Sequence, residues 1–126
     1  MNVLIISTRK HFWQTIAPYF QAKEFALDFT DTLDKALDRL KEVPPIVIIL
    51  DSEPCKTKEE YILRIRDDLT AILKINAMVH TAVVSSLSND EFHNCMEGFG
   101  VLLNIPLKAS QHDVERLAEA LEKCQC

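Results

Sequence analysis

Apolar residues occur along the chain in two alternating patterns. Five short runs are largely apolar, as buried parallel strands are, and they cover residues 3–6, 26–29, 46–50, 81–85 and 101–104. The run 26–29 is the most mixed, which is typical of an edge strand. Between the runs, apolar residues recur every three or four positions, the period of a helix packed on one face. The pattern therefore predicts five strands alternating with five helices.

A hydroxyl residue stands at the expected start of each helix, where it can accept a hydrogen bond from a free backbone N–H. These residues are Thr8, Thr32, Thr57, Ser88 and Ser110. Glutamates three positions after Thr57 and Ser88 complete two capping-box signals. Pro18 is expected to kink or end the first helix. The long stretch 57–79 predicts an extended third helix or an added turn.

Strands that alternate with helices favour a parallel sheet, because parallel strands need crossover connections and those connections cover both faces. We therefore predict an α/β fold, a three-layer sandwich with a five-stranded parallel sheet. No repeat, low-complexity tract or linker interrupts the pattern. Residues 1–126 are interpreted as a single domain.

Composition and charge argue against several classes of partner and binding site. The net charge of −5 has the wrong sign for a protein that grips phosphate backbones, so nucleic acid is not an expected partner. No apolar run approaches the roughly 20 residues of a membrane span, and no signal peptide is visible, so a cytoplasmic protein without membrane contact is expected. No cysteine or histidine has metal-site spacing. Four cysteines are interpreted as free thiols: Cys55, Cys95, Cys124 and Cys126.

The functional crevice of such a fold lies at the carboxyl ends of the strands, where the strand order reverses. The residues that follow strands one, three, four and five are Ser7, Thr8, Arg9, Lys10, Asp51, Ser52, Glu53, Ser85, Ser86, Ile105, Pro106 and Lys108. Both glycines, Gly98 and Gly100, precede the fifth strand, which excludes the usual glycine-rich phosphate loops. Residues 7–10 could still attract a small anion, since they join hydroxyls and two cations to a helix start.

These positions resemble the receiver domain of two-component response regulators over almost the whole chain. The matching features are Asp51 at the end of strand three, Ser85 or Ser86 at the end of strand four, and Pro106 after strand five within "EGFGVLLNIP". The resemblance implies a flavodoxin-like strand order of 2-1-3-4-5. It also implies phosphorylation of Asp51 from a phosphohistidine with the help of Mg²⁺.

Two departures set this chain apart from that family. The acid pair that would hold Mg²⁺ after strand one is replaced by Ser7 and Thr8, followed by cationic Arg9 and Lys10. The phosphate-pairing lysine of strand five aligns with Ile105, and Lys108 lies three residues further on. Catalysis of phosphoryl transfer depends on positioning and electrostatics, so little is left to support it. The chain resembles a degenerate pseudo-receiver.

Three interpretations of Asp51 stay open. It is a structural acid held by backbone amides or paired with Arg9 or Lys10, a residual phosphoacceptor, or part of a ligand pocket. The first hypothesis for function is a non-enzymatic signalling protein that binds other proteins, with a homodimer among the options. The resemblance places its partner face at about residues 89–124, and Phe92 and Phe99 are expected to contribute to this face.

The second hypothesis is a true phosphoacceptor in which Glu53 helps to bind Mg²⁺. The third is a flavodoxin-like domain that binds a small anionic ligand at residues 7–10. Cofactors are not expected, and a metal is expected only if Asp51 accepts a phosphoryl group.

Overall fold

The computed structural model describes residues 1–124, and within them one parallel sheet has the strand order β2-β1-β3-β4-β5. The strands are β1 (Asn2–Ile6), β2 (Ala26–Thr30), β3 (Val47–Asp51), β4 (His80–Val84) and β5 (Asn104–Ile105). The predicted fold class is confirmed, and so is the strand order that the resemblance implied.

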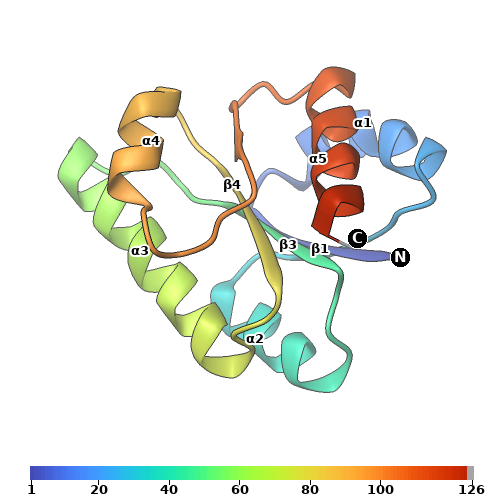
Figure 1. Ribbon diagram of the computed structural model, residues 1–126, viewed down its shortest axis with the longest axis horizontal. Coiled ribbons are helices and arrows are strands. Elements are labelled where there is room, and N and C mark those ends of the chain that lie inside the picture. The colour runs from blue at the N-terminus through green and yellow to red at the C-terminus, as the bar shows by residue number, and fades with distance from the viewer. Residues whose placement is uncertain (125–126) are drawn as a thin grey trace.

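Five helices cover the two faces of the sheet (Figure 1). They are α1 (Lys10–Ala22), α2 (Leu33–Glu42), α3 (Lys58–Ile75), α4 (Asn89–Cys95) and α5 (Gln111–Cys124). Helices α1 and α5 pack on one apolar core, while α2, α3 and α4 pack on the other. Successive side chains of the central strands enter opposite cores, as Val47 and Ile48 do, because a strand alternates its faces. The central strands are apolar throughout for this reason.

Three of the predicted helix caps are present. The side chains of Thr32 and Thr57 each accept a hydrogen bond from the backbone N–H three residues later, and Ser88 forms a complete capping box with Glu91. The prediction for Thr8 was wrong, since Arg9 is the N-cap of α1 and makes no side-chain cap hydrogen bond. Ser110 lies at the start of α5, but its hydroxyl donates to the carboxylate of Asp113 instead of accepting from the backbone.

Pro18 does not end α1, contrary to the sequence prediction. The helix continues to Ala22 with Pro18 inside it. Pro18 and Gln14 both lie on the exposed side, so the Gln14 carbonyl that loses its helical donor can bind water. The buried residues Trp13, Ile16 and Phe20 hold the helix against the sheet on both sides of the proline.

The third helix is extended, as predicted, and runs for 18 residues. The fifth strand differs from its prediction, because the regular ladder covers Asn104–Ile105 instead of residues 101–104. Two glycines with positive φ, Gly98 at 92° and Gly100 at 67°, turn the chain just before it. The Leu102 N–H already donates to the Thr81 carbonyl at 2.8 Å. The chain thus reaches β4 before the ladder becomes regular.

Candidate functional site

The sheet reverses its strand order at β1, which pairs with β2 on one side and β3 on the other. The loops that follow β1 and β3 leave the sheet in opposite directions and form a crevice between them. Asp51 is the last residue of β3, and its side chain is only 3% exposed. A buried carboxylate costs considerable free energy unless hydrogen bonds or an opposite charge compensate it.

Three side chains from the start of the chain donate hydrogen bonds to Asp51, and all of them reach the same oxygen, Oδ2. The Ser7 hydroxyl lies at 2.7 Å, Arg9 Nε at 2.9 Å and Trp13 Nε1 at 3.0 Å. Arg9 also supplies an opposite charge. Asp51 Oδ2 is therefore compensated by groups of the protein itself. Of the compensating groups that the sequence left open for Asp51, backbone amides, Arg9 or Lys10, the ion pair with Arg9 is present.

Arg9 connects three loops at once. Besides its bond to Asp51, its Nη1 donates to the Leu107 carbonyl at 3.0 Å, in the loop between β5 and α5. Its guanidinium also stacks 4.4 Å from the centre of the Phe12 ring. A planar guanidinium can make these contacts together, whereas a lysine ammonium cannot. The guanidinium therefore fixes the loops after β1, β3 and β5 relative to one another.

The residues around Asp51 divide into inward and outward groups. Ser7 and Arg9 turn toward Asp51, while Thr8, Lys10 and Glu53 are exposed. In the described part of the chain, no three acidic, histidine or cysteine side chains are placed to hold a metal ion. The arrangement is a polar network with an internal cation, in which Arg9 Nη2 is buried without a hydrogen-bond partner.

A small cavity of about 220 Å³ opens beside this network on the α3 side. Its charged lining consists of Asp31, Asp51, Glu53, Arg64 and Asp68. Burial raises the pKa of Asp68 above its ordinary range, and the nearby Arg64 opposes this shift only in part. Asp68 is a polar position on the buried side of a helix, and sequence reasoning missed it.

The raised pKa of Asp68 makes its charge destabilising at neutral pH. Between the ordinary pKa and the raised one, the folded state binds more protons than the unfolded state, so stability falls as pH rises through this window. Asp68→Asn is therefore expected to increase the free energy of unfolding at about pH 7 and to have little effect at about pH 3, where both states are protonated. Urea denaturation at both pH values measures this.

The matched control for Asp68→Asn is Asp38→Asn, at an exposed position of α2. This control is expected to show no comparable gain at either pH. Equal stability of Asp68→Asn and the wild type at neutral pH would contradict the assignment of a destabilising buried charge.

The two serines that end β4 have different environments. Ser85 is buried, and its hydroxyl donates to Asn104 Oδ1 at 2.5 Å. Asn104 Nδ2 in turn donates to the Leu87 carbonyl at 3.1 Å, so Asn104 ties the loop between β4 and α4 to β5. Ser86 is exposed. The Ser85 hydroxyl is thus engaged with β5, and sequence reasoning missed the residue that holds it.

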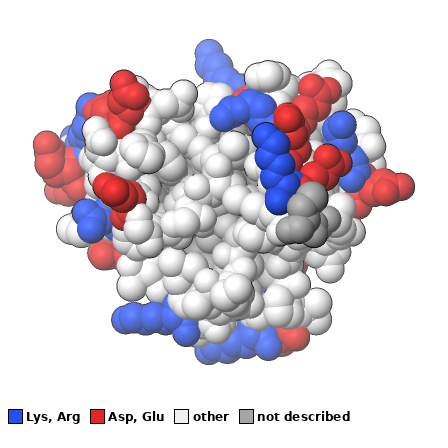
Figure 2. Space-filling view, in the orientation of Figure 1, with Lys and Arg blue, Asp and Glu red and all other residues white. Residues whose placement is uncertain are grey.

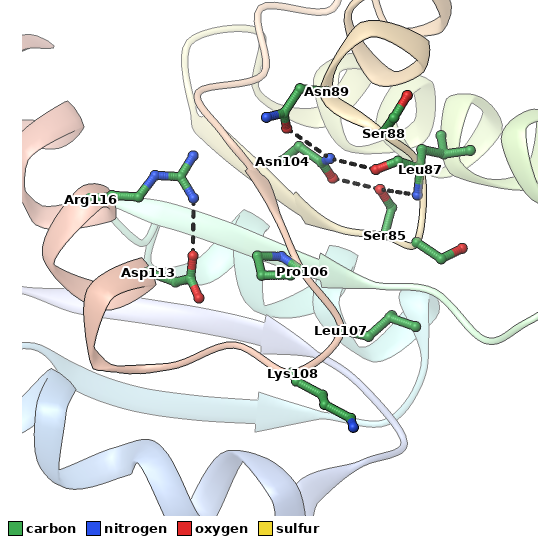
Figure 3. Close-up of a pocket in the computed structure, with 11 residues that line it drawn as sticks. Ser85, Leu87, Ser88, Asn89, Asn104, Pro106, Leu107, Lys108, Asp113 and Arg116 are labelled. Atoms are coloured by element: carbon green, nitrogen blue, oxygen red, sulfur yellow. Dashed lines mark hydrogen bonds and ion pairs between the residues drawn. The ribbon is translucent and has the colours of Figure 1, made fainter.

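The end of β5 carries the second departure from the receiver pattern. Ile105 is 3% exposed and packs in the core beneath α1 and α5. Lys108 is exposed and lines a cavity of about 600 Å³ with Pro106, Arg116 and Asn104 (Figure 3). Asp51 pairs with Arg9 instead of Lys108. The cation that a lysine would supply after strand five comes from the loop after strand one.

Phe92 and Phe99 are not an exposed partner surface, which corrects the sequence analysis. Phe92 is 8% exposed and belongs to the core under α3, and Phe99 packs against that core with Arg66 over its ring. Their spacing predicts one apolar helix face, but it does not show whether that face packs in the core or binds a partner.

The described cysteines are free thiols, as the sequence analysis predicts. Cys55, Cys95 and Cys124 are free thiols, and Cys126 lies outside the described residues. Among the described residues, no helix is both long and apolar enough to cross a membrane.

Comparison with known proteins identifies the fold. No protein-family model matches the chain, and no curated protein sequence matches it. Several solved structures match it over nearly their whole lengths. A two-component response regulator from Clostridium difficile has a TM-score of 0.76 at 11% sequence identity, with 99% of this chain and 98% of that chain covered.

A CheY-like response regulator receiver domain from Methanospirillum hungatei has a TM-score of 0.75 at 12% identity, covering 98% of this chain and 95% of that chain. A CheY-like protein from Pseudomonas aeruginosa has a TM-score of 0.71 at 9% identity, covering 96% and 92%. At such low identities the likeness concerns the fold alone. The chain has the receiver fold, with an arginine paired to the strand-three aspartate.

Proposed function

We propose that this protein is a receiver-like signalling domain that binds other proteins without phosphorylation of Asp51. The observation that carries the proposal is the ion pair between Arg9 and Asp51 Oδ2. Mg²⁺ at this carboxylate would stand close to a guanidinium, and like charges at such distances repel each other. The protein's own cation takes the place that a metal would need.

The hydrogen-bond network supports a single, fixed conformation of the crevice. Ser7 and Trp13 share Asp51 Oδ2 with Arg9, and Arg9 holds the Leu107 carbonyl. The Ser85 hydroxyl is occupied by Asn104. A domain held in this way keeps the same surface conformation without a phosphorylation switch. The domain therefore acts by binding a partner through the surface of residues 89–124, without substrate turnover and without a cofactor.

The experiment is the intact mass of the purified protein after incubation with acetyl phosphate and Mg²⁺. We expect no phosphoryl adduct, because Asp51 is paired with Arg9 and Ile105 stands at the position of the phosphate-pairing lysine. A receiver domain that has the acid pair, treated in the same buffer, is the positive control, and circular dichroism verifies that the protein is folded. An adduct in the wild type that disappears in Asp51→Asn would contradict the proposal and support the phosphoacceptor hypothesis.

A further inference from the structure

A cavity of about 230 Å³ opens where α3 begins, between the loop that follows β3 and the loop that follows β4. We call it the α3 cavity. Its apolar lining comes from Pro54, Tyr61 and Leu87, and Cys55 lies beside them. Pockets for drug-sized ligands usually measure about 300–1,000 Å³, so the α3 cavity suits a smaller chemical group.

Ser52 places an unused hydroxyl group in the wall of the α3 cavity. Side chains alternate along β3, so that Leu50 enters the core covered by α2, α3 and α4, while Asp51 points to Trp13 on α1. Ser52, the next residue, points back to the α3 side and lines the cavity. It is only 9% exposed, and among the described residues its Oγ has no hydrogen-bond partner. A ligand with an oxygen acceptor would remove the cost of this unpaired hydroxyl.

The charged lining of the α3 cavity is basic. It consists of Lys56 and Lys58, and no acidic side chain lines the cavity. Lys58 is paired with Glu91, whereas Lys56 is exposed and makes no ion pair in the described part of the chain. Figure 2 shows acidic and basic side chains mixed around the margin of the molecule, without a large patch of one sign on the displayed face. Lys56 is therefore the group that can select the charge of a ligand here.

Cys55 supplies a thiol at the edge of the same cavity. The residue is half-buried and packs against the core beneath α3. Burial raises the pKa of Tyr61, and the negative charges that Asp51 and Cys55 can carry add to this shift. The Cys55 thiol thus lies close to a phenol that stays neutral. A group attached to Cys55 Sγ would extend into the cavity between the lysines and Ser52.

We propose that Cys55 is a site of reversible modification by a small thiol that carries a carboxylate. The thiol is joined to Cys55 as a mixed disulfide, and its body fills the α3 cavity. Its carboxylate lies near Lys56 and accepts a hydrogen bond from Ser52 Oγ. Asp51 takes no part in the modification, so this inference does not depend on the proposed function.

The modification is a thiol–disulfide exchange in which a small disulfide is the oxidant. The Cys55 thiolate attacks one sulfur of the reagent, a new bond forms between that sulfur and Cys55 Sγ, and the disulfide bond of the reagent breaks. The other half leaves as a thiolate and takes up the proton that Cys55 has released to water. An excess of the free small thiol reverses the reaction.

Other places in the molecule suit this modification less well. The cavity of about 220 Å³ also has Ser52 in its lining, but it is lined by four acidic residues and no cysteine. Cys95 packs at the edge of the core, and Cys124 is exposed at the end of α5. An exposed thiol exchanges with disulfides of either charge. A preference for one charge is therefore the property that distinguishes a built site at Cys55.

The experiment equilibrates the full chain with two disulfides of similar size and opposite charge, each mixed with its free thiol. The disulfide of mercaptopropionate is the anionic reagent, and cystamine is the cationic one. Peptide mass spectrometry gives the fraction of mixed disulfide at each cysteine. At Cys55 we expect the equilibrium constant for the anionic thiol to exceed that for the cationic thiol by about fivefold or more. Cys124 is the control within the same chain and should show no such preference.

Ser52→Ala should lower the constant for the anionic thiol at Cys55 by about fivefold, because it removes the hydroxyl donor. Ser86→Ala is the matched control, since it removes an exposed hydroxyl from the lining of the same cavity, and it should have little effect. Lys56→Gln should reduce the preference for the anionic thiol. Lys41→Gln, at an exposed position of α2, should leave that preference unchanged. Circular dichroism verifies that each variant is folded.

A Cys55 that forms no mixed disulfide, or that has the same constant with both reagents, would overturn the proposal. A preference that persists in both Ser52→Ala and Lys56→Gln would also overturn it, because Cys55 would then react as any accessible thiol does. An adduct that excess mercaptopropionate fails to remove would contradict reversibility. Each of these results would leave the proposed function standing, whereas a phosphoryl adduct on Asp51 would contradict that function and leave the Cys55 site standing.

Discussion

Replacing Trp13 with alanine is expected to lower the free energy of unfolding by about 3–5 kcal/mol, a large fraction of the stability of an ordinary domain. The Trp13 side chain is 1% exposed and lies within 6.3 Å of the Phe20 ring, centre to centre. Its indole N–H also reaches the Ser7 hydroxyl and Asp51 Oδ2. The substitution therefore removes core volume and one donor to a buried carboxylate together.

Trp13→Phe separates these two contributions. It keeps an aromatic ring in the core but loses the N–H, and it is expected to cost about 1–3 kcal/mol, the value for leaving a buried polar group with one donor fewer. Urea denaturation followed by circular dichroism measures both variants, because Trp13 is the single tryptophan and its fluorescence disappears with it. Tyr19→Ala, at an exposed position of the same helix, is the control and should cost much less. A loss below about 1 kcal/mol in Trp13→Ala would contradict this account.

Arg9→Ala is expected to lower the free energy of unfolding by about 1–3 kcal/mol, because it leaves a buried carboxylate without its cation. This loss lies below the usual range for a broken buried pair, since the Arg9 side chain is 36% exposed and two neutral donors to Asp51 remain. Arg9→Lys should recover only part of the loss, since an ammonium cannot reach Asp51 and the Leu107 carbonyl with a fixed fork.

A double-mutant cycle of Arg9→Ala and Asp51→Asn tests the pair directly. If the two side chains stabilise each other, the double variant should be more stable than the sum of the single losses predicts, by about 1–3 kcal/mol. Lys10→Ala, at the exposed next position, is the control and should not couple to Asp51→Asn. Additive losses for Arg9 and Asp51 would show that the ion pair contributes nothing to stability, and the structural role of Asp51 would then be wrong.

The fold was predictable because its signals are local. Apolar runs such as residues 46–50 define buried strands, and the caps at Thr32, Thr57 and Ser88 mark helix starts. Two local rules were overridden by tertiary packing. The buried face of α1 continues past Pro18, and the turn at Gly98 and Gly100 delays the ladder of β5.

The site was predictable only in part. The position of Asp51 near the cations Arg9 and Lys10 follows from strand ends that meet at one edge of the sheet, but the choice of Arg9 as its partner does not. The roles of Trp13 and Asn104 do not, because each residue satisfies an ordinary pattern: Trp13 lies on the apolar face of a helix, and Asn104 ends an apolar run. Their polar groups acquire a role only when partners 38 and 19 positions away are in place. The prediction of a partner surface at Phe92 and Phe99 fails for the opposite reason, because their neighbours bury Phe92 and partly cover Phe99.

The sequence separations within the Arg9 contacts also bear on how the protein folds. Arg9 meets Asp51 across 42 positions and the Leu107 carbonyl across 98, nearly the length of the chain. Contacts that close such large loops carry an entropic cost and generally form after local helices and neighbouring strands. Interactions made after the rate-limiting step mainly slow unfolding and hardly change the folding rate. The Arg9 contacts are thus expected to form late in folding. Their loss should shorten the lifetime of the native state much more than it slows folding.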